Sequence, residues 1–154
     1  MLSIRAKKKG PAARFLLLYL ILSALHLVPV RSVAAVAPVD LIQSVIQQQM
    51  AAFNKEDYAT AITFAAESIR ERFTKERFET MVRSGYPQIA KSHLVSFGEI
   101  TLSKDNQAAL ATVHVTGKDR VTVIAQYQML LEGTAWKIGG VTILEQFQPI
   151  GTPI

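Results

Sequence analysis

The clearest structural signal in this sequence is an alternating run in its second half, Val121-Thr-Val-Ile-Ala-Gln-Tyr-Gln-Met-Leu-Leu131. Every second residue of the run is apolar, and polar residues fill most of the positions between them: Val121, Val123, Ala125, Tyr127, Met129 and Leu131 alternate with Thr122, Gln126 and Gln128. A period of two places successive side chains on opposite faces of a β-strand. The run therefore predicts a strand with one face in the core.

Three further segments with strand character surround this run, at residues 93–102, 108–116 and 136–146. Short turn clusters separate the segments, at Lys104-Asp-Asn106, Gly117-Lys-Asp119 and Glu132-Gly-Thr134. Antiparallel strands can be joined by tight turns, whereas parallel strands need crossover connections of a dozen residues or more. The second half therefore predicts an antiparallel meander, with a bulge or a close packing contact at Gly139-Gly140 in the last strand.

The first half of the chain has the period of helices. One stripe advances by four, three and four residues through Ile42, Ile46, Gln49 and Phe53. This spacing predicts a helix that ends near Asn54. Asp40 and Gln43 have the spacing of a capping box, which predicts that Asp40 caps the start of this helix.

Two more helices are expected before the strands. Asp57 can cap a helix that runs to about Ala66, and Ser68-Ile-Arg-Glu71 has the spacing of another capping box at a short turn. Thr74 opens a third helix, which Gly85-Tyr86-Pro87 ends because proline cannot continue it. Helices followed by strands favour an α+β fold, with three N-terminal helices packed on the antiparallel sheet.

The N-terminus has the pattern of a secretory signal peptide. Five basic residues lie within residues 1–14, a 16-residue apolar run covers residues 15–30, and small residues follow at Ser32, Ala34, Ala35 and Ala37. The apolar run is shorter than the ~20 residues of a membrane-spanning helix, although an N-terminal membrane anchor remains the alternative. We expect export to the periplasm or the medium, with cleavage near Ala34 or Ala37.

The basic character of the chain belongs to this leader. The formal net charge of the whole chain is +5, but residues 1–37 hold six of the 17 basic residues and none of the 12 acidic residues. The remainder carries 17 − 6 = 11 basic residues against 12 acidic ones, a net charge of −1. This balance argues against a nucleic-acid partner. The absence of cysteine excludes disulfides and thiolate metal sites.

Several short segments together resemble a known family. They are Gln48-Gln-Met-Ala-Ala-Phe53, Ala65-Ala-Glu-Ser-Ile-Arg70, Phe78-Glu-Thr-Met-Val82, Gly85-Tyr-Pro87 and Trp136-Lys-Ile-Gly-Gly-Val141. They are similar to a bacterial domain-of-unknown-function family, number 4864, within the nuclear-transport-factor-2-like superfamily of cone-shaped α+β domains. The resemblance covers roughly residues 40–145. It implies a pocket between the helices and a curved, concave sheet, and a homodimer formed through the sheet.

The resemblance and the leader together define the expected organisation of the chain. Residues 1–37 form a signal peptide or an N-terminal membrane leader, residues 38–147 form the nuclear-transport-factor-2-like domain, and residues 148–154 form a flexible tail. Apolar residues on both faces of the sheet also favour a homodimer, because one face packs on the helices and the other remains for a partner.

The candidate pocket residues are an amide, a histidine and three phenols: Gln49, Tyr58, Tyr86, His93 and Tyr127. A mostly apolar pocket with a few polar groups is the usual design of a small-ligand site. Gln49 has a structural alternative, in which its amide ties the first helix to the Tyr86 loop or to a strand end. The leading hypothesis is an exported, non-enzymatic domain that binds a small ligand or a protein partner.

Two other functions stay open. An isomerase- or dehydratase-like enzyme would need a base in a dry pocket, and His93 or Glu99 could serve with a tyrosine as hydrogen-bond donor. A purely structural, dimerising domain of the cell envelope is the third possibility. His93 and His114 are the only histidines after the leader, too few for a metal site without further ligands. We therefore expect no metal, no cofactor and no catalytic residues.

Overall fold

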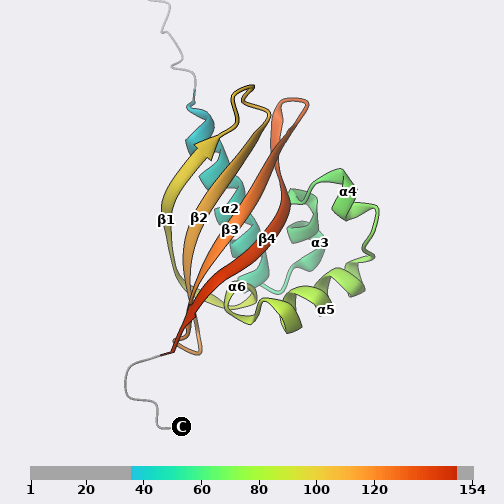
Figure 1. Cartoon of the computed structure of the whole chain (residues 1–154). Helices are drawn as coiled ribbons and strands as arrows, with labels where there is room; N and C mark the ends of the chain where they lie inside the picture. Colours follow the sequence, from blue (N-terminus) through green and yellow to red (C-terminus); the bar gives the residue numbers. More distant parts are fainter. Residues whose placement is uncertain (1–35, 149–154) are drawn as a thin grey trace, which may run out of the picture. The chain divides into compact units, whose positions relative to one another are not determined.

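The computed structural model describes residues 36–148, which form one compact unit (Figure 1). In chain order the elements are α2 (Pro38–Asn54), α3 (Tyr58–Ala61), the 3-10 helix η2 (Ile62–Phe64), α4 (Glu67–Arg70), α5 (Lys75–Gly85), α6 (Pro87–Ala90), β1 (Ser92–Leu102), β2 (Ala108–Gly117), β3 (Thr122–Glu132) and β4 (Ala135–Phe147). The predicted leader and tail lie outside the described residues, apart from positions 36, 37 and 148. Within 36–148, no helix has the length and hydropathy to cross a membrane.

Helix α2 forms around the predicted stripe. Its four stripe residues are all buried, which confirms the helical period: Ile42, Ile46, Gln49 and Phe53. The predicted cap at Asp40 is wrong, because the helix already begins at Pro38 and Ala37 occupies the cap position without a side-chain bond. Proline is favoured in the first turn, where its missing N–H would have no partner in the helix.

The second predicted helix is broken into short pieces, whereas the third is confirmed. Asp57 caps α3 as expected, accepting a hydrogen bond from the Thr60 N–H at 3.0 Å. The segment then passes through η2 and an extended Ala65 before α4 begins at Glu67. Thr74 caps α5 by accepting from the backbone N–H of Arg77. Helix α6 was not predicted, and its Pro87 sits at a helix start.

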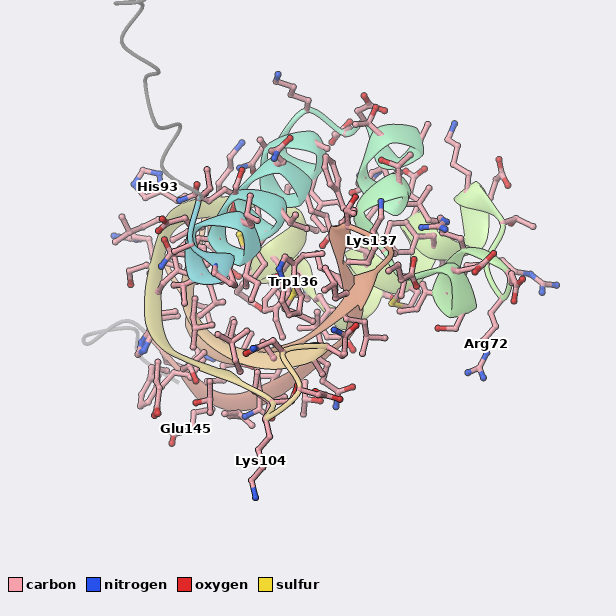
Figure 2. All side chains as sticks on the ribbon, turned by 90° about the horizontal axis from the view of Figure 1, so that it is seen from above. Arg72, His93, Lys104, Trp136, Lys137 and Glu145 are labelled. Atoms are coloured by element: carbon pink, nitrogen blue, oxygen red, sulfur yellow. The ribbon has the colours of Figure 1, made fainter. Side chains whose placement is uncertain are left out.

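The four strands pair in the order β1-β2-β3-β4, and every pair is antiparallel, as predicted. The register shifts twice between β1 and β2 and twice between β3 and β4. Such bulges bend a strand and increase its twist. The sheet is accordingly curved, and α2 lies in its hollow (Figure 2).

The core lies between this hollow face and the helices. The buried residues of β3 follow the predicted alternation, and those of β2 alternate in the same way: Ala109, Ala111, Val113, Val115, Val123, Ala125, Tyr127 and Met129. Trp136 of β4 also belongs to the core and points into the hollow (Figure 2). The predicted bulge at Gly139 is confirmed, because Gln128 pairs with Gly140 while Met129 pairs with Ile138.

Candidate functional site

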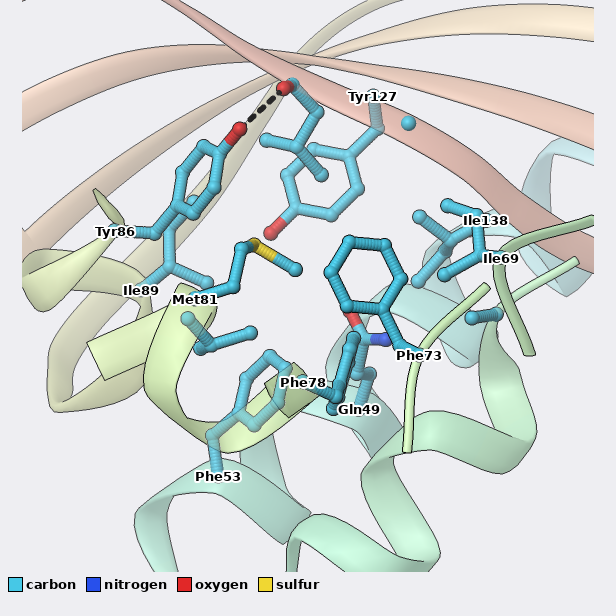
Figure 3. Close-up of a pocket in the computed structure, with 14 residues that line it drawn as sticks. Gln49, Phe53, Ile69, Phe73, Phe78, Met81, Tyr86, Ile89, Tyr127 and Ile138 are labelled. Atoms are coloured by element: carbon cyan, nitrogen blue, oxygen red, sulfur yellow. Dashed lines mark hydrogen bonds between the residues drawn. The ribbon is translucent and has the colours of Figure 1, made fainter. Parts of the chain in front are cut away.

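A pocket of about 350 Å³ opens between the helices and the second half of the sheet. Its walls come from α2, from α4 and α5 with the segment between them, and from β3 and β4 (Figure 3). The volume lies near the lower end of the range of about 300–1,000 Å³ that is typical of small-molecule sites. Most of the lining is aliphatic or aromatic, and the side chains with polar groups are Gln49, Tyr86 and Tyr127.

Gln49 contributes an amide from the buried stripe of α2 to the pocket. Its side chain is only 4% exposed, and its Nε2 donates a hydrogen bond to the carbonyl oxygen of Ala61 at 3.2 Å. The amide therefore ties α2 to α3, where the sequence had indicated the Tyr86 loop or a strand end. Gln49 thus combines the structural role with a place in the pocket lining.

Tyr86 fixes the wall formed by β4. It follows Gly85, where α5 ends, and its hydroxyl donates to the carbonyl oxygen of Val141 at 3.0 Å (Figure 3). Gly140 and Val141 line the pocket directly after the bulged residue Gly139. A hydrogen bond between residues 55 positions apart in the chain therefore connects the end of α5 to the bulged part of β4.

Tyr127 supplies a phenol from the inner face of β3. The residue is 0% exposed, and its hydroxyl has no hydrogen-bond partner. Figure 3 shows the hydroxyl directed toward the middle of the pocket. Burial, with a smaller contribution from Tyr86, raises the pKa of Tyr127 above its ordinary value. The phenol therefore keeps its proton at neutral pH and remains a hydrogen-bond donor.

Tyr58 and His93 lie outside the pocket lining. Tyr58 is buried against Phe53, with ring centroids 5.7 Å apart, and its hydroxyl also lacks a partner. His93 is exposed on β1, on the outside of the sheet (Figure 2). Glu99, the other candidate base, is also exposed on β1 and accepts a hydrogen bond from Thr101. The structure thus brings together Gln49, Tyr86 and Tyr127, and it does not bring either candidate base to them.

Phe73 is a pocket residue that the sequence analysis missed. It lies between α4 and α5, directly before the cap residue Thr74, and both Phe73 and Phe78 line the pocket (Figure 3). These two positions correspond to N′ and N4 of α5, the two places of a hydrophobic staple. An apolar residue before a confirmed cap was the available signal, since the staple packs such a residue against the first turn of the helix.

The electrostatics of the pocket are neutral. No charged side chain belongs to its lining. Over residues 36–148, no group of three or more His, Cys, Asp or Glu side chains is placed to hold a metal ion. The phenols and the amide can therefore donate and accept hydrogen bonds to a ligand, but they offer no countercharge for an ionised one.

Two solved structures align with this domain. An NTF-2-like protein of unknown function from Shewanella oneidensis MR-1 aligns with 17% identity and a TM-score of 0.53, over 70% of this chain and 98% of that one. A phospholipid-binding protein from Ralstonia solanacearum, solved with a phospholipid, aligns with 10% identity and a TM-score of 0.46, over 68% of this chain and 76% of that one. The first likeness supports the fold alone.

The family assignment comes from the sequence match. Comparison with curated proteins gives no match. Residues 37–150 match the family described as Domain of unknown function (DUF4864). This match covers every helix and strand of the structure. The helices packed on a curved four-stranded antiparallel sheet agree with the expected nuclear-transport-factor-2-like fold. The chain therefore belongs to the family Domain of unknown function (DUF4864) and has the NTF-2-like α+β fold.

Proposed function

We propose that the domain binds a small, predominantly apolar ligand in the pocket between α2, α5 and the inner face of β3 and β4. The observation that carries this proposal is the pocket itself, about 350 Å³ lined by aromatic and aliphatic side chains. Protein cores are packed nearly as densely as organic crystals and contain few voids larger than a water molecule. A space of this size, with neutral walls, therefore supports binding of an apolar molecule.

The polar groups of the pocket favour binding over catalysis. Acid–base catalysis needs a titratable group placed against the substrate, with its pKa near the working pH. The pocket offers the Gln49 amide and the phenols of Tyr86 and Tyr127, and the pKa of Tyr127 is raised further from neutrality. His93 and Glu99 are exposed to solvent on β1.

A fluorescent apolar probe tests the proposed function. We expect N-phenyl-1-naphthylamine, an uncharged dye that brightens in apolar surroundings, to bind the purified full-length protein saturably with one site per chain. Val141→Phe extends a large ring from the pocket wall and should weaken binding about tenfold or more. Leu144→Phe is the matched control, because Leu144 lies in the same strand but is 51% exposed and outside the pocket lining.

Two outcomes would contradict the proposed function. One is the absence of saturable binding to the wild-type protein. The other is equal binding by the Val141→Phe and wild-type proteins when both have the same thermal unfolding midpoint. Equal binding would show that the dye occupies another part of the chain, such as the apolar N-terminal run at residues 15–30.

We also propose that the domain acts after export and forms a homodimer through the outer face of the sheet. The leader pattern of residues 1–37 supports export. Mass spectrometry of the mature N-terminus checks it, and an intact Met1 on a membrane-bound protein would contradict it.

Exposed apolar residues on or beside the outer face support the dimer, among them Leu94, Leu110, Leu130 and Phe147. A monomer in sedimentation at tens of micromolar would contradict the dimer.

A further inference from the structure

We propose that the ligand of this pocket is an uncharged carbonyl compound, a ketone, ester or tertiary amide, whose oxygen accepts a hydrogen bond from the hydroxyl of Tyr127. This inference rests on the proposed function and adds to it the chemical class of the ligand. The apolar body of the ligand would contact the aromatic wall formed by Phe53, Phe73 and Phe78.

The Tyr127 hydroxyl is a donor without an acceptor. Its oxygen is inaccessible to solvent and has no partner among the described residues. The neighbouring side chains on the same face of β3 are those of Ala125 and Met129, which offer no strong acceptor. Buried polar groups in folded proteins are normally hydrogen-bonded, so an orphaned donor calls for an explanation. A ligand that supplies the missing acceptor provides one.

The surroundings select a neutral acceptor. An ionised carboxylate would enter a pocket that contains no positively charged side chain, and burying an unpaired charge is strongly unfavourable. A carbonyl oxygen without an N–H or O–H group is satisfied by the single bond from Tyr127. The Tyr86 hydroxyl is already committed to Val141.

Met81 provides a route to the buried hydroxyl. Its side chain is partly exposed, and together with Phe73 it lines both the pocket and a shallow groove on the outer side of α5. These two residues therefore lie between the pocket and this groove. Figure 3 shows the Met81 thioether directed toward the middle of the pocket, like the Tyr127 hydroxyl. A methionine side chain has three rotatable bonds and repacks at low cost, so a ligand can displace it.

Three ligands of the same carbon skeleton test the inference. Butyrophenone carries a ketone, butylbenzene carries no polar group, and 4-phenylbutyrate carries a carboxylate. Each competes with N-phenyl-1-naphthylamine for the full-length protein. We expect butyrophenone to bind about tenfold more tightly than butylbenzene, the effect of one good buried hydrogen bond. The carboxylate should bind most weakly of the three.

Two matched variants assign the effect to one hydroxyl. Tyr127→Phe should bind butyrophenone and butylbenzene equally, which corresponds to a loss of about tenfold for the ketone alone. Tyr58→Phe is the control, because it removes the other buried hydroxyl without a partner, which lies outside the pocket lining. This variant should keep the full preference for the ketone.

The outcomes separate the two proposals. Tight binding of the dye with no preference for the ketone, or a preference that survives in Tyr127→Phe, would overturn the carbonyl inference and leave the ligand-binding function standing. Tightest binding by 4-phenylbutyrate would also overturn the inference. Failure of the wild-type protein to bind the dye at all would remove the proposed function itself.

Discussion

Removing the Tyr127 hydroxyl should make the ligand-free protein more stable. The phenol is fully buried and donates to no partner, so folding removes its hydrogen bonds to water and replaces them with none. An unsatisfied buried polar group costs about 1–3 kcal/mol. Tyr127→Phe removes that cost and leaves a gap no larger than a water-sized probe sphere, about 10–15 Å³. At ~24 cal/mol per Å³ this gap costs about 0.3 kcal/mol.

The expected net gain in the free energy of unfolding is therefore about 0.7–2.7 kcal/mol. For a domain of this size, 1 kcal/mol corresponds to a shift of about 3–5 °C in the thermal midpoint. Urea denaturation of the purified full-length protein, followed by tryptophan fluorescence, measures the change. Trp136 is the sole tryptophan of the chain and is buried in the core, so its signal reports the unfolding of this domain.

The same chemical change at Tyr86 is the control. Its hydroxyl donates to the Val141 carbonyl, so Tyr86→Phe breaks a hydrogen bond and should lower the free energy of unfolding by about 0.5–1.5 kcal/mol. The two variants are thus expected to shift stability in opposite directions. A loss of stability in Tyr127→Phe would refute the reasoning, because it would show that the hydroxyl is satisfied in solution, for example by a buried water.

Three further predictions concern other contacts. Gln49→Leu removes the donor to the α3 carbonyl and should cost about 1–3 kcal/mol of unfolding free energy in urea, and an unchanged value would contradict that bond. Gly117→Ala places Cβ 2.5 Å from Asp119 Oδ1 and should cost about 1–3 kcal/mol, whereas Gly85→Ala meets no atom within 4 Å and should not lower the thermal midpoint. Because burial raises the pKa of Tyr127, this phenol makes the free energy of unfolding independent of pH below pH ~10, and above it the free energy of unfolding falls as the unfolded phenol ionises, by about 1.4 kcal/mol per pH unit. Above pH ~10, the free energy of unfolding of Tyr127→Phe should therefore fall with pH less steeply than that of the wild-type protein, by that amount. Identical slopes for the two proteins would contradict the prediction.

Local pattern was enough to predict most of the helices and strands. In the folded domain, the buried residues follow the alternation of residues 121–131 and the helical stripe that ends at Phe53. Where a prediction was wrong, another interaction outweighed the local sequence pattern on which it rested. Asp40 has a capping-box partner, but Pro38 starts the helix earlier. The helix expected up to Ala66 stops because that segment is held to β4, where the Ala66 N–H donates to the Ile138 carbonyl.

The candidate site was only partly predictable from the sequence. The sequence analysis named Tyr58 and Tyr127 alike as pocket residues, and both side chains are buried without a hydrogen-bond partner. Nothing in the local sequence shows that one phenol faces a cavity while the other packs against Phe53. His93 was expected among the pocket residues, but it is exposed on β1.

The sequence by itself determined the strands, the two longer helices and the antiparallel order of the sheet, because these follow from the spacing of residues along the chain. The tertiary structure alone decided that a space remains between α5 and the sheet. That space depends on the bulge at Gly139, on the Tyr86–Val141 hydrogen bond and on the placing of Phe73 between two helices. A cavity forms where elements that are distant in the chain do not pack completely against one another. The spacing of apolar residues within a single helix or strand carries no information about such a gap.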